Sequence, residues 1–234
     1  MNEGFVSRIK YTPIELDLPE LKALEVSNGR VYVTPSGRHL PSVTTVTGFE
    51  EKDGYAIWRR KNPQEAQRVV ERGNRIHSMM EHFLKGEQVE LTENERIDSL
   101  YHMMRSHVEN YIENVYALET HLWSEEIGLA GRVDCICDYD GILSVVDFKG
   151  STRNKRESDI KHYFLQATAY ALIFQEITKR PVGQIVIVVA SEDGKIQEFR
   201  KKPIDHVNGL LRAIRLYDQW YQLNPTTPVF PLAE

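Results

Sequence analysis

Two short segments, Gly131-Arg132-Val133-Asp134 and Val145-Val146-Asp147-Phe148-Lys149, contain the pattern that decides the fold of this chain. Successive side chains of a strand point to opposite faces, so Asp147 and Lys149 are expected on one face, about 7 Å apart. Asp134 belongs to the preceding strand of a predicted hairpin, whose turn contains the Asp-Gly step that tight hairpins favour. The pattern therefore predicts two carboxylates and one amine that converge across neighbouring strands.

Paired carboxylates on adjacent strands suit a hard divalent cation. Mg²⁺ takes oxygen ligands and usually keeps several waters and substrate phosphate oxygens. Asp134 and Asp147 would supply two ligands, and the main-chain carbonyl of Phe148 a third. Such an ion polarises a phosphoryl oxygen and lowers the pKa of a bound water, while Lys149 stabilises developing negative charge. The predicted chemistry is the hydrolysis of a phosphodiester bond.

An ordinary surface ion pair is the alternative for an Asp-x-Lys triplet, because exposed pairs are common and weak. Two features argue against it. The segment 142–148 is nearly continuously apolar, as in a strand covered on both faces, where a buried acid needs a partner or a metal. Gly131, shortly before Asp134, is typical of a close approach of the backbone.

Length and composition bound the class of protein. The 234 residues contain no linker-like stretch or repeat and predict one domain, 1–234, with an N-terminal hairpin and helical region, 1–120, and a catalytic core, 121–222. No apolar run approaches the roughly 18 residues that span a bilayer, so no membrane segment is expected. The acidic N-terminus lacks an apolar signal core, and a cytoplasmic location is expected.

The net charge of −5 argues against a broadly basic nucleic-acid binder, although binding depends on local patches. One basic loop follows the Asp147 strand. It contains Arg153, Lys155, Arg156 and Lys161, which are candidate phosphate contacts. The alternative for this loop is a solvated charged surface.

Caps and apolar spacing predict four helices and seven strands around the motif. The helices are expected at 63–85, 92–116, 159–178 and 203–223. The strands are expected at 30–33, 38–40, 121–127, 132–139, 142–149, 184–190 and 195–200. Because a helix connects the strands at 142 and 184, a parallel pair is expected, which gives an α/β fold with a mixed sheet flanked by helices.

Two of these helices carry further candidates. His77 lies on the apolar stripe of the first helix, where it is either a core residue or a metal ligand. Glu81, one turn later, is a candidate to orient His77 or to help bind the metal. Gln166 and Tyr170 are four residues apart, so they share one face of the third helix near the strand ends.

Four segments together resemble the RecB-type branch of the PD-(D/E)xK nucleases. They are Arg72-Gly73-Asn74-Arg75-Ile76-His77, Gly131-Arg132-Val133-Asp134, Val146-Asp147-Phe148-Lys149-Gly150 and Gln166-Ala167-Thr168-Ala169-Tyr170. Within that branch, roughly residues 40 to 222 resemble the mitochondrial genome maintenance exonucleases and their phage and bacterial relatives. The acidic N-terminus favours a bacterial setting, or the host cytoplasm if the chain is phage-encoded.

The resemblance implies a restriction-endonuclease-like fold with an N-terminal helical arch, and a Mg²⁺- or Mn²⁺-dependent DNA exonuclease that acts on single-stranded ends more than on duplexes. It assigns metal binding to His77, Asp134 and Asp147, catalysis to Lys149, and positioning of the lysine or the substrate to Gln166. Tyr170 is a candidate DNA contact on the same helix as Gln166. Some relatives hold an iron–sulfur cluster on four cysteines; this chain has two, Cys135 and Cys137, and no such cluster is expected.

Two alternatives stay open at this point. One is a processive duplex exonuclease of the phage recombination type, which usually needs a closed assembly around DNA. The other is a non-catalytic nucleic-acid-binding module that keeps the fold. The polarity of digestion, the number of metal ions, the oligomeric state and any protein partners are also open.

Overall fold

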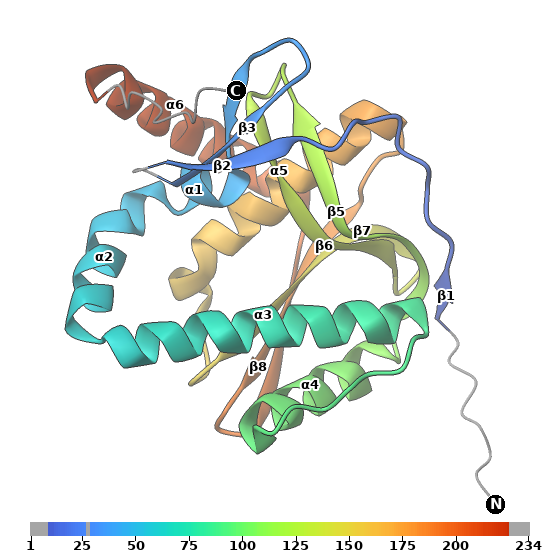
Figure 1. Ribbon diagram of the computed structural model, residues 1–234. Helices are drawn as coiled ribbons and strands as arrows, with labels where there is room; N and C mark the ends of the chain where they lie inside the picture. The colour runs from blue at the N-terminus through green and yellow to red at the C-terminus, as the bar shows by residue number, and fades with distance from the viewer. Residues whose placement is uncertain (1–8, 27–28, 225–234) are drawn as a thin grey trace, which may run out of the picture.

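The computed structural model describes residues 9–26 and 29–224, which form a six-stranded mixed sheet with helices on both faces and a separate three-stranded sheet (Figure 1). The strands are β1 (Lys10–Tyr11), β2 (Lys22–Val26), β3 (Gly29–Val33), β4 (His39–Pro41), β5 (Ile112–Ser124), β6 (Leu129–Tyr139), β7 (Ile142–Ser151), β8 (Gln184–Ser191) and β9 (Lys195–Lys201). The helices are α1 (Val43–Thr47), η1 (Phe49–Glu51), α2 (Lys52–Lys61), α3 (Pro63–Lys85), α4 (Glu95–Val108), η2 (Glu157–Ile160), α5 (Lys161–Thr178), η3 (Pro203–His206) and α6 (Val207–Leu223).

The main sheet has the strand order β1-β5-β6-β7-β8-β9. β5, β6 and β7 form an antiparallel meander, and β8 lies parallel to β7 after the crossover through α5. β9 then returns antiparallel to β8. The predicted α/β fold, a mixed sheet flanked by helices, is confirmed, and the expected N-terminal arch corresponds to the stretch from α1 to α3.

Two apolar cores hold this sheet between its helices. Side chains of α3 and α4 pack on one face, and those of α1, α5 and α6 pack on the other. β8 is buried along its whole length, as expected for a strand covered on both sides. Cys135 and Cys137 are buried free thiols in the core beneath α3 and α4.

The long helix α3 begins and ends where its sequence predicts. Pro63 occupies the first turn, where its missing N–H costs nothing, and Gly86 ends the helix with a left-handed φ of 76°. The buried stripe of α3 includes Ile76 and Met80 and faces the sheet. On the sheet side, Gly150 of β7 allows α3 to approach closely, since a Cβ at this position would lie 2.5 Å from Ile76 Cδ1.

The prediction of one helix over 92–116 was wrong in its second half. α4 begins after Asn94, whose side chain accepts a hydrogen bond from Arg96 N, and it ends at Val108. The chain then turns into β5 at Ile112, well before the predicted start at 121. Ile112 and the following β-branched and aromatic residues bury against β6, and this pairing overrides the helical spacing.

Five elements were absent from the prediction: β1, β2, α1, η1 and α2. The first four are five residues or shorter. α2 is longer, but it has no buried residue. Among the described residues, no helix is long and apolar enough to cross a membrane.

Candidate active site

Three acidic side chains form a row across β5, β6 and β7. The register of β5 and β6 places Glu119 opposite Asp134, and the register of β6 and β7, continued by one residue, places Asp134 opposite Asp147. The ladder between β6 and β7 ends one residue before this row, so the strands separate there. Asp134 Oδ2 instead accepts a hydrogen bond of 3.0 Å from Phe148 N. Where the ladder ends, the side chain of Asp134 therefore takes the place of a main-chain acceptor for β7.

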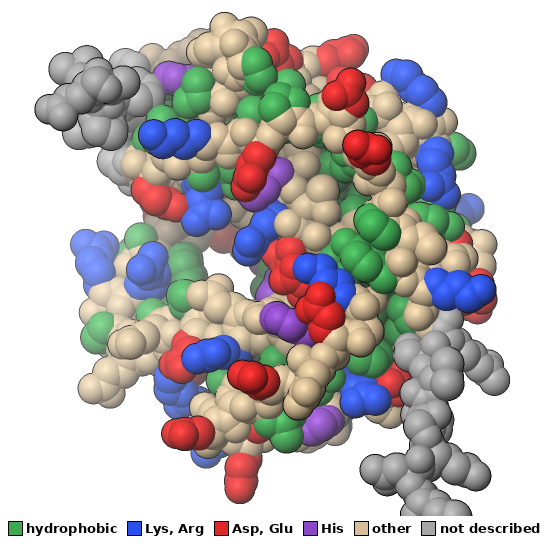
Figure 2. Space-filling model, turned by 45° about the vertical axis from the view of Figure 1, so that its right-hand side comes forward, with side chains coloured by type: hydrophobic (Ala, Val, Ile, Leu, Met, Phe, Trp, Pro, Cys, Tyr) green, Lys and Arg blue, Asp and Glu red, His purple; other side chains and the backbone are tan. Residues whose placement is uncertain are grey.

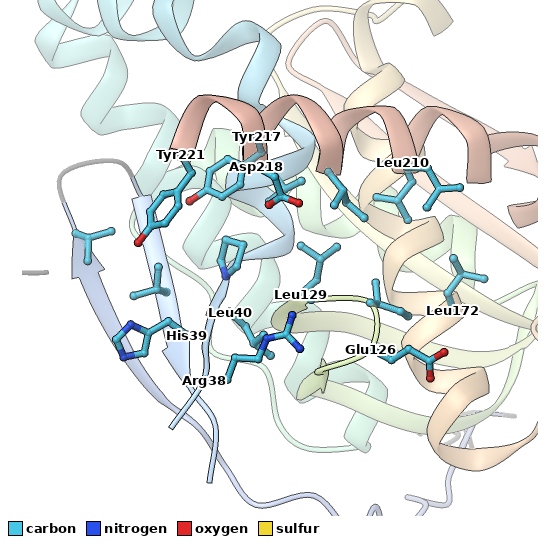
Figure 3. Close-up of a pocket in the computed structure, with 18 residues that line it drawn as sticks. Arg38, His39, Leu40, Glu126, Leu129, Leu172, Leu210, Tyr217, Asp218 and Tyr221 are labelled. Atoms are coloured by element: carbon cyan, nitrogen blue, oxygen red, sulfur yellow. The ribbon is translucent and has the colours of Figure 1, made fainter. Parts of the chain in front are cut away.

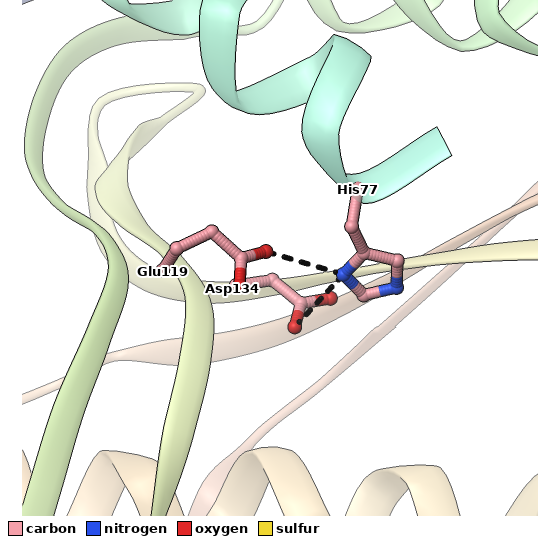
Figure 4. Close-up of side chains that lie close together, drawn as sticks. All are labelled: His77, Glu119 and Asp134. Carbon is pink, nitrogen blue, oxygen red and sulfur yellow. Dashed lines mark hydrogen bonds and ion pairs between the residues drawn. The ribbon is translucent and has the colours of Figure 1, made fainter. Parts of the chain in front are cut away.

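His77 reaches this row from α3. Its Nδ1 lies 3.3 Å from Glu119 Oε1 and 3.4 Å from Asp134 Oδ1 (Figure 4). One ligand atom from each of the three residues can be chosen so that all lie within 4.8 Å of one another, a spacing that suits a metal ion. Glu81, which the sequence suggested as a partner of His77, pairs instead with Lys85 at 2.7 Å.

Glu119 is the residue that the sequence analysis missed. Its backbone φ is 45°, in the left-handed region that a glutamate rarely adopts. Its second oxygen, Oε2, lies 2.8 Å from Arg132 Nε, so the carboxylate bridges His77 and Arg132. Strained backbone at a cluster of polar groups is typical of functional sites, because the surrounding structure has to hold it in place.

Asp147 is 3% exposed, and one of its carboxylate oxygens accepts two hydrogen bonds. Lys149 Nζ lies 2.7 Å from Asp147 Oδ1, and Gln166 Nε2 donates to the same oxygen at 2.9 Å. Lys149 Nζ is also 4.0 Å from Asp134 Oδ2. The other oxygen, Asp147 Oδ2, is buried and has no hydrogen-bond partner among the described residues. A buried carboxylate oxygen without a partner is costly, and a cation would satisfy it.

The family model of the PD-(D/E)XK nuclease superfamily matches residues 49–224, which contain the whole row of acids, His77, Lys149 and Gln166. The chain belongs to this nuclease superfamily. The resemblance expected from the sequence motifs is thereby confirmed. The nucleases of this superfamily use divalent metal ions, and the cluster of His77, Glu119 and Asp134 in this chain has the donor atoms for one.

Three individual proteins are similar to parts of the chain. The chain is 30% identical over 137 residues to mitochondrial genome maintenance exonuclease 1 of Homo sapiens, a match that covers 54% of this chain and 38% of that protein. A solved structure from Eubacterium rectale described as an exonuclease aligns at 14% identity and a TM-score of 0.44, over 62% of this chain and 63% of the other. The structure of SSO0001 aligns at 19% identity and a TM-score of 0.41, over 81% and 78%.

The charges of the nuclease site are strongly coupled. Burial opposes the charge of the His77 ring, but the carboxylate of Asp134 overrides it and raises the pKa of His77 to about 10. Burial also opposes the charge of Asp134, yet His77 and Lys149 lower the pKa of this acid to about 2. Asp134 is therefore the acid that stays ionised under all ordinary conditions.

Asp147 behaves differently from Asp134. Burial raises its pKa to about 6, with Lys149 opposing the shift and the negative charge of Asp134 adding to it. The two carboxylates in turn raise the pKa of Lys149, against the effect of burial, so its amine is charged. In the metal-free nuclease, two protonated groups, His77 and Lys149, balance the acids. A bound divalent cation would replace the positive charge of the protonated His77 ring next to these acids.

The nuclease site opens into a cavity of about 1210 Å³. Figure 2 shows a hollow on this side of the molecule, with acidic, basic and histidine side chains at its edge. Its lining comes mainly from α1, α2, α3, β6 and α5, and it includes His77, Glu119, Asp134, Lys149 and Gln166.

A second pocket of about 670 Å³ lies between α6, α5 and the small sheet (Figure 3). Its lining is mostly apolar, with leucines such as Leu129, Leu172 and Leu210. The three residues that have the donor atoms for a metal ion, among those described, line the other cavity. That cavity is therefore the candidate active site.

The predicted DNA contacts lie at different depths around the nuclease site. Tyr170 is 3% exposed in the cavity wall, where a Cβ on Gly131 would lie 2.5 Å from the Tyr170 hydroxyl. This close approach explains the glycine in the first motif. Three members of the basic loop, Arg153, Arg156 and Lys161, are exposed, whereas Lys155 is half-buried. None of these four cations is among the residues described as lining the cavity, and their contact with DNA stays a prediction.

Proposed function

We propose that this chain is a Mg²⁺- or Mn²⁺-dependent exonuclease that hydrolyses phosphodiester bonds in DNA, with a preference for single-stranded ends. The observation that carries the proposal is the buried, partnerless oxygen Asp147 Oδ2, in the same row as Asp134 and Glu119 and beside the charged Lys149. The similarity to a mitochondrial exonuclease supports action at DNA ends.

Each side chain has a distinct role in this proposal. His77, Glu119, Asp134 and Asp147 would hold the cation, with the carbonyl of Phe148 as a further candidate ligand. A bound divalent cation supplies a water of lowered pKa and polarises the phosphoryl oxygen. Lys149 stabilises the negative charge that develops on the phosphate.

Gln166 acts on the site through Asp147. Its amide donates to Asp147 Oδ1, the oxygen that also accepts from Lys149. These two hydrogen bonds fix the rotation of the carboxylate and leave Asp147 Oδ2 as the oxygen that would be free to bind a cation. Gln166 is thus proposed as a residue that positions the metal ligand.

End-labelled DNA tests the proposed function directly. With Mn²⁺, the protein should degrade linear single-stranded DNA labelled at the 5′ or the 3′ end, leave circular single-stranded DNA intact, and cut linear duplex more slowly. The order of products from the two labels gives the polarity. Cleavage of the circle at the linear rate would indicate an endonuclease, faster cleavage of duplex would favour the recombination-type alternative, and intact DNA throughout would reject the proposal.

The middle of α3 offers a test of the cavity. Gly73 lies one turn before His77 and lines the cavity, and a Cβ added there would meet no atom within 4 Å. A glycine inside a helix costs about 0.5 to 1 kcal/mol relative to alanine. Gly73→Ala should therefore raise the free energy of unfolding by about that amount, whereas Gly73→Leu should fill the cavity and lower kcat/KM on DNA by roughly tenfold.

Gly54 provides the matched control for this prediction. It lies inside α2 with the same open space around it, but it is not among the cavity-lining residues. Gly54→Leu should leave cleavage unchanged. Equal loss of activity from Gly54→Leu and Gly73→Leu, measured as initial rates, would show that the effect does not arise from the cavity.

The basic loop after β7 is expected to contact phosphates. Each lost contact on a single strand should reduce the slope of log K against log salt by about 0.7, so Arg153→Glu with Arg156→Glu should reduce it by roughly 1.4. Fluorescence anisotropy of labelled DNA in Ca²⁺ measures this slope. Lys179→Glu, at the far end of α5, is the control and should change little. An unchanged slope in the double variant would remove the loop from the interface.

A further inference from the structure

α2 is a helix that contributes no side chain to the buried cores. None of its residues is buried, and in Figure 1 it stands apart from both sheets and joins α3 at its end. A helix that packs on a core shows an apolar stripe facing it. The exposed apolar side chains of α2 include Tyr55, which is 45% exposed, and Ile57, which is 46% exposed. The two residues are two positions apart and so point to different faces of the helix, and of the two only Tyr55 is described as lining the cavity of the acids.

The aromatic side chains of α2 are already arranged as a stack. The rings of Tyr55 and Trp58 lie 5.7 Å apart, at an angle of 20° between their planes. Tyr55 is one of the residues that line the cavity, whereas Trp58 is not. Trp58 therefore supports the Tyr55 ring from behind, while Tyr55 faces the same space as His77 and Lys149.

Positive charge accompanies the exposed ring. The last turn of α2 contains Arg59, Arg60 and Lys61. The guanidinium carbon of Arg59 lies 5.8 Å from the centre of the Tyr55 ring, and Arg59 also lines the cavity. An aromatic ring next to a guanidinium group is the combination that binds a base together with its phosphate.

One face of α3 connects this ring to the acids. Val70, Gly73 and His77 line the cavity at successive helical turns, and the distance from Val70 to His77 along the helix is about 10 Å. Val70 is 48% exposed and Gly73 has no side chain, so this face is open. A strand held at Tyr55 would pass over it to reach the metal ligands.

We propose that Tyr55, supported by Trp58, stacks on a base of the DNA strand that enters the cavity, with Arg59 placed for its phosphate. The inference rests on the proposed function and adds to it the source of the preference for single strands. Every base of a duplex is already stacked and paired, so only an unpaired base offers its face to Tyr55. α2 thereby selects an unpaired end before it reaches the acids.

Binding to two matched strands tests this inference. One is a thymidine oligonucleotide, and the other is an abasic strand of equal length with the same phosphates and no bases. In Ca²⁺, the wild-type protein should bind the thymidine strand roughly tenfold more tightly than the abasic strand. Tyr55→Ala should remove this difference and leave affinity for the abasic strand unchanged, whereas Tyr55→Phe should keep it.

A matched control comes from α6. Tyr221 is 37% exposed and stacks on Tyr217 at 6.1 Å and 19°, outside the cavity of the acids. Tyr221→Ala should leave both affinities unchanged. The inference would be overturned if the wild-type protein bound the two strands with equal affinity, or if Tyr55→Ala lost affinity equally for both. If Mn²⁺-dependent cleavage of DNA were still observed, the proposed function would stand. A wild-type protein that neither bound nor cleaved DNA would overturn both.

Discussion

Asp147→Asn should lower the rate of DNA cleavage by at least about 1,000-fold, while DNA binding in Ca²⁺ stays within roughly threefold of the wild type. Asp147 Oδ2 is the buried oxygen without a partner, and an amide in its place would offer the cation a neutral ligand or a donor. The shape of the side chain is unchanged, so substrate binding through other residues should persist. Single-turnover rates with Mn²⁺ and anisotropy with Ca²⁺ measure the two effects.

Asp138 provides the matched control on β6. Its Oδ2 accepts hydrogen bonds from Asn114 Nδ2 at 2.9 Å and Tyr116 Oη at 2.6 Å, outside the row of acids. Asp138→Asn should leave cleavage within a few-fold of the wild type. If Asp147→Asn kept a tenth or more of the wild-type rate, the role of this carboxylate in catalysis would be wrong.

The affinity for Mn²⁺ should rise about tenfold for each pH unit between pH 7 and pH 8.5. The pKa of His77 is raised to about 10, so at neutral pH its ring is protonated and competes with the cation for Asp134 and Glu119. The pH range lies above the pKa of Asp147, about 6, so that this acid adds no slope. Isothermal titration in buffers of different ionisation enthalpy should show the release of about one proton.

A variant without the imidazole separates His77 from the other groups. His77→Gln should bind Mn²⁺ with almost no dependence on pH in this range. The control is His162→Gln, since His162 also lines the cavity but pairs with Glu51 at 3.0 Å, away from the row. A wild-type affinity that did not change with pH would contradict the placement of His77 in the metal site.

The same charge has an effect on the metal-free fold. A histidine whose pKa is raised in the folded state stabilises the protein fully below its unfolded value of about 6.5. This stabilisation is lost as the pH rises through about 10, because the ring of His77 then gives up its proton next to Asp134. A bound cation would restore the balance of charge, so Mn²⁺ should raise the melting temperature more at pH 9 than at pH 7.

Local sequence patterns were enough to predict most of the candidate site. Strand alternation placed Asp147 beside Lys149, and a strong helix start and stop placed α3, so that the position of His77 on an inward stripe could be read directly. Gln166 was found on the crossover helix by its spacing within the motif. The structure brings these residues together with Asp134 around one opening in the sheet.

Glu119 could not be predicted in the same way. It lies in a stretch between the predicted helix and the predicted strand, and β5 reaches it only after two irregularities in its pairing with β6. Its left-handed φ breaks the alternation that a strand pattern needs. The signal for Glu119 is the register with Asp134, which exists only once the two strands are paired.

α2 was missed for a related reason. Secondary structure is found in a sequence through the side chains that a core buries, and α2 buries none. Tyr55 is exposed and Trp58 is half-buried, so neither ring belongs to the core. A helix whose side chains stay outside the core thus leaves little trace in the sequence.

The metal site is tested most directly by the location of a bound ion. Crystals soaked in Mn²⁺ should show one strong anomalous peak at the row of acids, in contact with Asp134 and Asp147 and with Glu119 or His77 close by. The result that would contradict the proposed site is the absence of a peak in this row under conditions in which Mn²⁺ supports cleavage, or a peak bound only by residues outside the row.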